Sequence, residues 1–281
     1  MRLREHIASD RVGPQAGRPS RITVLAEEPP GVSGPGPTNG VAREIGSIVE
    51  RGRLLAVCGL CGGAGTSTLA YLVALAAARS HPGSVLVADT GGPTGGLSCY
   101  AGVETPRSLA ELSEDALARP STGLVIATGR DRVLVLATGP RFTRACACAR
   151  EGIELLLDQA RERYTLTVID CGTLSRDADQ IALASASHVA WVLPATLSAM
   201  RRAHRVLAAA TPQFFDQEVL VARHDGPTRR APLKDLRRIA NDRGATLVLL
   251  PTVPDLATGD VAAALETAQV SLQAIQGALA R

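Results

Sequence analysis

The sequence predicts an α/β protein, with a mostly parallel, doubly wound sheet and helices on both faces. Two observations lead to this fold class. Short uninterrupted runs of Val, Leu, Ile and Ala alternate along the chain with longer segments whose apolar residues have helical spacing. The strands of a parallel sheet are buried on both faces, so they read as continuous apolar runs. A chain of 281 residues can bury a full core as one domain.

The composition divides the chain into two parts. Residues 1–40 are rich in Pro, Gly, Ser and Arg, a composition that does not repay the entropy lost on ordering. We therefore predict a flexible N-terminal tail there, with one short extended piece at Arg21–Leu25. Residues 41–281 are the predicted domain, which begins with a short helix at Val41–Arg51.

In the first half of the domain, apolar runs alternate with helical segments and turns. The stretch Gly91–Gly96 is predicted to be a loop, because glycine and proline dominate it. The predicted strands are Leu54–Gly59, Ser84–Asp89, Leu124–Ala127, Val133–Ala137 and Leu166–Asp170. The predicted helices are Ser67–Arg79, Leu109–Ala118 and Glu151–Arg163.

In the second half, helices and strands alternate regularly. One helix has a proline in its first turn, Pro232, and a glycine just after its end, Gly244, as helix boundaries favour. The predicted helices are Asp177–Ala184, Leu197–Ala210, Pro232–Arg243 and Val261–Leu279. The predicted strands are His188–Leu193, Glu218–Ala222 and Thr246–Leu250.

The glycine-rich turn after the first strand of the domain has the order strand, loop, helix of a phosphate-binding loop. In such loops the backbone N–H groups and the helix N-terminus face an anion. The pattern G-x-x-x-x-G-K-[ST] is half met, because Gly65 and Ser67 fit, whereas Leu60 and Thr66 replace the first glycine and the lysine. The predicted nucleotide-binding residues are Gly62, Gly63, Ala64, Gly65, Thr66, Ser67 and Thr68.

Two acidic residues, Asp89 and Asp170, end predicted strands. In open α/β sheets the ligand lies beyond the carboxyl ends of the strands, so both acids are candidates for the same site as the loop. The alternative is that each is a surface acid at a strand end.

At the loop the sequence resembles the ParA/MinD group of P-loop ATPases. Their loop reads K-G-G-x-G-K-[ST], and this chain has Cys-Gly-Gly-Ala-Gly-Thr-Ser from Cys61 to Ser67. Both family lysines are therefore replaced, by Cys61 and Thr66. The chain most resembles the CpaE/TadZ-like and septum-site-determining-like members, in which the loop lysine is often lost, and the resemblance extends from Arg53 to Arg281.

The resemblance implies roles for three residues around a Mg²⁺ ion. Ser67 would coordinate the ion directly, and Asp170 would hold it through water as the Walker-B acid. Asp89 matches the first acid of the family's D-x-D motif. The second acid of that motif, which positions the attacking water, is replaced by Gly91.

These replacements affect catalysis more than binding. A charge-assisted hydrogen bond from lysine to phosphate contributes roughly 1.5–3 kcal/mol, whereas the loop amides and the helix dipole remain. Hydrolysis also needs charge stabilisation and a positioned water. We therefore expect ATP or ADP with Mg²⁺ to bind weakly or not at all, and ATP hydrolysis to be negligible. The alternatives are a slow ATPase activated by a partner and a ParA-like DNA-partitioning protein.

The net charge of +3 is mild, and Lys234 is the only lysine, so a cation that compensates for the missing one has to be an arginine or come from a partner. Basic residues are concentrated on two later helices, where they are either a DNA-binding surface, as in ParA-like relatives, or ordinary solvated faces. They are Arg201, Arg202, Arg205, Arg229, Arg230, Lys234, Arg237 and Arg238.

The six cysteines are predicted to be free thiols in a reducing cytoplasm, because neither a signal peptide nor a membrane-length apolar run is found. The spacings Cys58-x-x-Cys61 and Cys146-x-Cys148 leave a metal or iron–sulfur site as the alternative. The last helix is amphipathic like the membrane helix of MinD, but it lacks Trp, Phe and a cationic face, so we predict that it packs on the sheet.

The function expected from the resemblance is that of a spatial organiser or scaffold. It implies protein partners in pilus or secretion machinery or in division-site placement, and a cytoplasmic protein recruited to the membrane or the pole through a partner. It also implies a homodimer. Because Cys61 replaces the lysine that reaches across the dimer in this family, we expect dimerisation that does not require nucleotide.

Overall fold

The computed structural model describes residues 22–24, 51–82, 84–92, 95–119, 123–140, 148–209, 217–224 and 230–280. Most of the predicted tail and the predicted helix at residues 41–50 lie outside these residues. Of the predicted extended piece, the structure describes strand β1 (Ile22–Val24).

One nine-stranded sheet runs through the described residues, in the order β1-β4-β5-β3-β6-β2-β7-β8-β9. The strands from β5 to β9 in this order are parallel, and β4 pairs antiparallel with β1 and with β5. The strands after β1 are β2 (Arg53–Gly59), β3 (Val85–Asp89), β4 (Val125–Thr128), β5 (Leu134–Leu136), β6 (Leu166–Asp170), β7 (His188–Pro194), β8 (Glu218–His224) and β9 (Thr246–Pro251).

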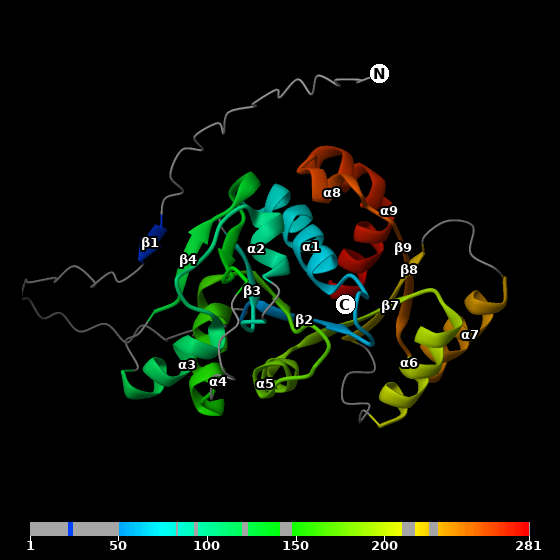
Figure 1. Ribbon diagram of the computed structural model, residues 1–281, viewed down its shortest axis with the longest axis horizontal. Coiled ribbons are helices and arrows are strands. Elements are labelled where there is room, and N and C mark those ends of the chain that lie inside the picture. The colour runs from blue at the N-terminus through cyan, green and yellow to red at the C-terminus, as the bar shows by residue number, and fades with distance from the viewer. Residues whose placement is uncertain are drawn as a thin grey trace, which may run out of the picture.

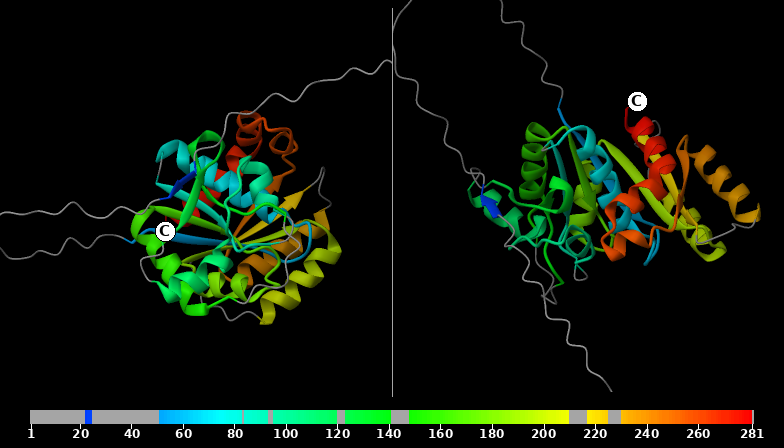
Figure 2. Two further views of the ribbon diagram at one scale, coloured as in Figure 1. Left: turned by 60° about the vertical axis from the view of Figure 1, so that its left-hand side comes forward. Right: turned by 90° about the horizontal axis from the view of Figure 1, so that it is seen from above.

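Helices cover both faces of the sheet (Figures 1 and 2). On one face lie α1 (Thr66–Ser80), α2 (Gly96–Ala101), α8 (Asp255–Thr258) and α9 (Val261–Leu279). On the other lie α3 (Leu109–Ala118), α4 (Arg150–Arg163), α5 (Asp177–Ser185), α6 (Leu197–Ala209) and α7 (Arg230–Asp242). A 3₁₀ turn at Arg130–Arg132 joins β4 to β5. The doubly wound, mostly parallel fold predicted from the sequence is confirmed.

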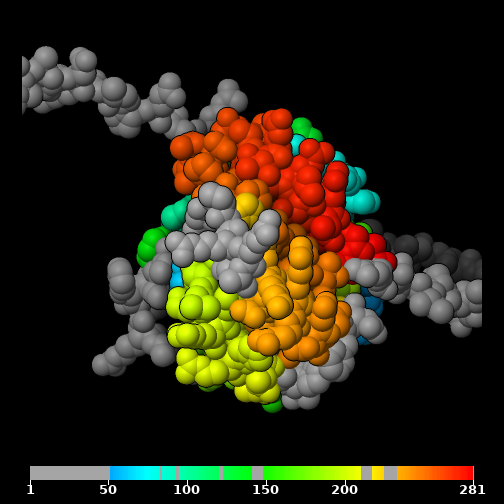
Figure 3. Space-filling model, turned by 90° about the vertical axis from the view of Figure 1, so that its right-hand side faces the viewer, coloured from blue at the N-terminus to red at the C-terminus, as the bar shows by residue number. Residues whose placement is uncertain are grey.

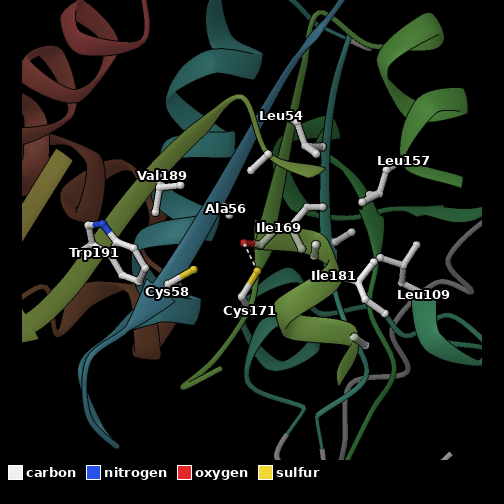
Figure 4. Packing of buried hydrophobic residues seen from close by; sticks show 14 of the residues in the cluster. Leu54, Ala56, Cys58, Leu109, Leu157, Ile169, Cys171, Ile181, Val189 and Trp191 are labelled. Atoms are coloured by element: carbon white, nitrogen blue, oxygen red, sulfur yellow. Dashed lines mark hydrogen bonds between the residues drawn. The ribbon is translucent and has the colours of Figure 1, made fainter. Parts of the chain in front are cut away.

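The central strand β2 shows how the sequence builds two cores. Successive side chains of a strand point to opposite faces. Leu54, Ala56 and Cys58 belong to the core beneath α3 to α7, whereas Leu55 and Val57 belong to the core beneath α1 and α9. Figure 4 shows the first of these cores, where side chains from β2, β6 and β7 meet those of α3, α4 and α5. The five β2 side chains from Leu54 to Cys58 are all fully buried, which explains why none of them is polar.

Two short helices were not predicted from the sequence. Helix α2 follows Gly95, which has the left-handed φ of 56°, and it lies against α1. Helix α8 is a single turn after Pro254. Helices this short gain little from their own hydrogen bonds, so tertiary contacts decide whether they form.

The last helix, α9, packs on the sheet as predicted. Most of its apolar side chains are buried against α1 and β9, with Val270 exposed on the outer side. Ser271 Oγ donates a hydrogen bond of 2.6 Å to the carbonyl oxygen of Leu249 in β9. Among the described residues, no helix is both long enough and apolar enough to span a membrane.

Candidate nucleotide-binding site

The loop from Gly59 to Gly65 is tied to the carboxyl ends of the neighbouring strands. The amide of Gly59 donates to the carbonyl of Gly172 at 2.6 Å, and the amide of Leu60 donates to that of Val192 at 2.9 Å. The loop then turns through Gly65, whose φ of 97° is left-handed, into the first residue of α1. Because a side chain at Gly65 would be strained in this conformation, the glycine allows the loop to bend directly into the helix.

A cavity of about 560 Å³ opens in front of this turn. Pockets that bind small molecules have volumes of about 300–1,000 Å³. All seven predicted nucleotide-binding residues, from Gly62 to Thr68, line it, together with Asp89 and Asp170. The structure therefore brings together the loop and both acids, which are far apart in the sequence.

Ser67 and Asp170 are in direct contact. Ser67 Oγ donates a hydrogen bond of 2.5 Å to Asp170 Oδ2, and the amide of Gly172 donates to Asp170 Oδ1 at 3.1 Å. Asp170 is only 6% exposed, and burial raises the pKa of its carboxyl, while the bond from Ser67 opposes that shift. The strand ending and the helix start thus meet at one buried carboxylate.

Asp89 lies beside Asp170, as its partner in the register between β3 and β6. It is also 6% exposed, and its Oδ1 accepts a hydrogen bond of 2.9 Å from the amide of Gly91. Burial, and secondly the negative charge of Asp170, raise the pKa of Asp89 from 3.8 to about 7.

Oxygen donors from Ser67, Asp89 and Asp170 fit a Mg²⁺ ion, which prefers hard oxygen ligands. A divalent cation would also favour the ionised forms of the two buried carboxyls. Among the described residues there is no cluster of three His, Cys, Asp or Glu side chains that would hold a metal alone. This agrees with an ion that one or two carboxylates hold together with the phosphates of a nucleotide.

The replaced family positions have structural roles of their own. A Cβ on Gly59 would lie only 3.0 Å from the methyl group of Thr66. The Thr66 hydroxyl opposes the rise in the pKa of Asp170 that burial causes. Cys61 is half-buried and packs against both hydrophobic cores. Gly91 has a φ of 97°, and a Cβ there would lie 2.6 Å from Ser108 Oγ. The backbone at Gly91 is therefore shaped for glycine.

The structure adds side chains to the cavity wall that the sequence did not assign to it, among them Tyr100, Arg176 and Arg223. Tyr100 OH and Thr68 Oγ1 are hydrogen bonded at 3.0 Å, and the Tyr100 ring stacks on that of Tyr71 with centroids 6.4 Å apart. Tyr100 follows Gly95, which also lines the cavity, by five residues. This closeness in sequence could have placed Tyr100 in the cavity wall only if helix α2 had been predicted.

Arg176 links the loop after β3 to the start of α5. Its Nε and Nη2 donate to the carboxylate of Asp179, and Nη2 also donates to Thr90 Oγ1 at 2.6 Å. Asp179 is fully buried, so the guanidinium of Arg176 balances its charge.

Arg223, at the end of β8, reaches the loop itself. Its Nη1 donates a hydrogen bond of 2.8 Å to the carbonyl oxygen of Gly63. Strand β7 lies between β8 and β2 in the sheet, so the side chain extends past one whole strand. The sequence signal that could have pointed to Arg223 is its place near the carboxyl end of a predicted strand, where ligands of such sheets bind.

The cysteine spacings do not make a metal site within the described residues. Cys58 and Cys171 are fully buried free thiols at the ends of β2 and β6, as Figure 4 shows for the core around them. Cys171 Sγ contacts the carbonyl of Ile169 at 3.8 Å. Cys146 lies outside the described residues.

Several solved structures share this architecture. A ParA family ATPase from Chlorobium tepidum superposes with a TM-score of 0.65 at 17% identity, covering 82% of this chain and 98% of that one. The MinC:MinD cell division protein complex of Aquifex aeolicus gives 0.62 at 14% identity, with coverage of 82% and 96%. The chain has the fold of the ParA/MinD ATPases.

A third structure of this fold was solved with a ligand. It is the septum site-determining protein MinD of Pyrococcus horikoshii complexed with Mg-ADP, with a TM-score of 0.55, 15% identity, and coverage of 81% and 93%. No family profile and no curated protein sequence matches the chain. At these identities the likeness describes the fold, and the function of this chain has to be argued from its own site.

Proposed function

We propose that this protein is a nucleotide-responsive spatial organiser of the CpaE/TadZ-like kind, which binds ATP or ADP with Mg²⁺ weakly and hydrolyses ATP little or not at all. In this role it positions other proteins, in pilus or secretion machinery or at a division site, and is recruited by them to the membrane or the pole. It acts as a homodimer that forms without nucleotide.

One observation carries the proposal: the residues that the resemblance assigns to nucleotide binding line the cavity, whereas two positions that it assigns to hydrolysis have other residue types. The loop amides, the start of α1 and the Ser67–Asp170 pair all line the cavity. Thr66 stands in the place of the lysine and Gly91 in the place of the second acid. Catalysis depends on charge that develops in the transition state, so losing these two groups lowers turnover more than affinity.

The organising role is supported by the fold and by one neighbour's assembly. The MinD structure from Aquifex aeolicus is a complex with MinC, so a protein of this fold can present a surface to a protein partner. On this chain, Leu197 and Leu117 are large apolar side chains more than half exposed, at the start of α6 and near the end of α3, and they are the positions at which we look for a partner first.

Calorimetric titration with ATP and ADP, with and without Mg²⁺, tests the binding half of the proposal. We expect dissociation constants in the micromolar range or weaker. A phosphate-release assay tests the other half, with a Ser67→Ala/Asp170→Ala variant as the control. Steady hydrolysis by the natural chain well above that of the double variant would contradict the scaffold role. It would support the alternative, a slow ATPase, especially if a partner protein accelerates it.

The dimer is tested by measuring the mass in solution. We expect a dimer at tens of micromolar protein with and without ATP. A monomer under both conditions would contradict this part of the proposal, and a dimer only with ATP would contradict its independence of nucleotide.

A DNA-partitioning role is the second candidate, and one surface favours it. Helices α6 and α7 lie side by side on the face that Figure 3 shows, and six of their basic side chains are exposed: Arg201, Arg202, Arg205, Lys234, Arg237 and Arg238. Of Arg229 and Arg230, the other two basic residues predicted for this surface, no side chain is described. A gel shift that weakens steeply with salt, and that an Arg201→Ala/Arg205→Ala variant abolishes, would favour DNA binding.

A further inference from the structure

A cationic side chain from another strand contacts the phosphate-binding loop. Two cationic side chains, Arg176 and Arg223, line the described part of the cavity. The carboxylate of Asp179 receives two donors from Arg176 at 2.6 and 3.2 Å. Because Asp179 is fully buried, Nε and Nη2 of Arg176 are held at that carboxylate, and Nη1 is the one guanidinium nitrogen that has no hydrogen-bond partner among the residues that the structure describes.

Arg223 is placed differently, because it contacts the loop. Its Nη1 donates to the carbonyl oxygen of Gly63 at 2.8 Å, at a position open to solvent. The same atom lies 3.4 Å from where a Cβ on Gly65 would stand, and Arg223 Cδ lies 3.6 Å from it. The side chain therefore runs along the loop from Gly65 to Gly63, across the backbone whose amides form the anion cradle.

The backbone of Arg223 is fixed, so this reach is built into the sheet. Arg223 pairs with Pro194 of β7 and with Leu250 of β9 in the register of the sheet. Its carbonyl oxygen accepts a hydrogen bond of 2.7 Å from the amide of Ala195. A guanidinium has five N–H donors in a planar fork and keeps its charge at any pH a protein tolerates, so it can contact a carbonyl and a phosphate together.

We propose that Arg223 takes over the work of the missing loop lysines, by binding the phosphate groups of a nucleotide held in the loop from Gly62 to Ser67. The inference rests on the proposed function, because it needs nucleotide to bind at this site. In this arrangement the cation comes from β8 and not from the loop, so nucleotide binding links the loop to the sheet edge formed by β8 and β9.

The test uses inorganic tripolyphosphate beside ATP and ADP, because it carries the charge of ATP without a base or a sugar. Calorimetric titrations compare the natural chain with Arg223→Met, which keeps the aliphatic stem, and with Arg223→Lys, which keeps the charge. Arg163→Ala, on the exposed surface of α4, removes one positive charge outside the cavity and is the control for long-range electrostatics. Thermal midpoints verify that all variants are folded.

We expect Arg223→Met to weaken tripolyphosphate and ATP binding by about tenfold to a hundredfold, the loss that one charge-assisted hydrogen bond accounts for. Arg223→Lys should lose much less, and Arg163→Ala should change little. If Arg223→Met binds tripolyphosphate as the natural chain does, or if the Lys variant is as weak as the Met variant, the inference is wrong while the proposed function stands. If the natural chain binds none of the three ligands, both are wrong.

Discussion

Two groups of residues around the same cavity differ in how they match the resemblance to the ParA/MinD ATPases. The retained group, Ser67, Asp89 and Asp170, has the residue types that the resemblance implies. The replaced group, Cys61, Thr66 and Gly91, has other residue types where the resemblance implies two lysines and an acid. Asp89 and Asp170 are each only 6% exposed, whereas the replaced group is half-buried, as is Ser67, which donates a hydrogen bond to Asp170.

The difference shows which parts of such a site also serve the fold. Asp170 holds the amide of Gly172 and the hydroxyl of Ser67, and Asp89 holds the amide of Gly91, so both acids fix the loops that follow their strands. The lysines of the family would extend from the loop towards a ligand and would fix nothing in the empty protein. We therefore expect their replacement by Cys61 and Thr66 to cost little stability.

The largest effect that we expect comes from Asp89, whose burial has an energetic cost. Its pKa is raised from 3.8 to about 7, so between these values the folded protein binds more protons than the unfolded chain does. Stability therefore falls as the pH rises from about 4 to about 7, by up to about 4 kcal/mol for this shift. Asp89→Asn should remove that loss. Urea unfolding across this pH range should find the variant more stable than the natural chain at pH 8 and similar to it near pH 4.

A carboxyl with the opposite shift gives the matched control. Hydrogen bonding and charge from Arg107 lower the pKa of Asp115, so Asp115→Asn should bring no gain in stability at pH 8. If Asp89→Asn is instead the less stable protein at pH 8, then Asp89 belongs to the fold as an anion, and the contrast between the two groups disappears.

Asp170 should have the next largest effect, on the magnesium dependence of binding. Asp170→Asn keeps an oxygen that can accept the bond from Ser67 but removes the charge that would hold Mg²⁺. We expect Mg²⁺ to strengthen ADP binding to the natural chain and the variant to lose this gain, by about tenfold to a hundredfold. Titrations with Mg²⁺ and with a chelator measure it. Equal affinities of both proteins with Mg²⁺ would mean that Asp170 has only its structural role.

The fold was predictable because its signals are local. The strand β6 and the helices α3 and α9 have the bounds predicted, since each is a continuous apolar run or a regular helical pattern between clear boundaries. The short helix α2 was missed because its stability comes from contact with α1 and not from its own sequence. The candidate site likewise has a part that local sequence determines and a part that tertiary contacts determine.

The loop and the two acids could be placed from the sequence, because parallel strands deliver their carboxyl ends to one edge of the sheet. Arg223 could not be placed. Its contact with Gly63 spans 160 residues and depends on the order of β2, β7 and β8 across the sheet, which the sequence pattern leaves open. That a compensating cation has to be an arginine or come from a partner was predictable from composition, and which arginine lies at the loop was not.

The replaced group can be restored in part, with a smaller expected gain. Thr66→Lys returns a cation to the loop and should tighten ATP binding by about tenfold, without producing turnover, because Gly91 still lacks an acid. Calorimetry and phosphate release on the same variant measure both. Hydrolysis appearing with Thr66→Lys alone would show that the missing acid is dispensable here.

Adding Gly91→Asp should fail for a structural reason. The left-handed backbone and the contact of 2.6 Å between a Cβ and Ser108 Oγ would strain the loop. Ser108 also caps α3 through its hydrogen bonds with Glu111, so this substitution should lower stability by about 1–3 kcal/mol. Denaturant unfolding measures the loss, and a Gly91→Asp variant as stable as the natural chain would show that the loop can adopt the family's conformation after all.

We expect the smallest effect from the hydrogen bond between Tyr100 of α2 and Thr68, which follows the phosphate-binding loop. Tyr100 OH and Thr68 Oγ1 are 3.0 Å apart, and this is a contact between a residue of the loop–helix start and a helix that follows the Gly91 turn. Tyr100→Phe should cost about 1 kcal/mol of unfolding free energy, and it should cost less in a chain that already carries Thr68→Val, because the two groups act on each other. If the two costs simply add, the hydrogen bond does not hold α2 in place, and the two sides of the cavity are joined by packing, such as the stacking of Tyr100 on Tyr71.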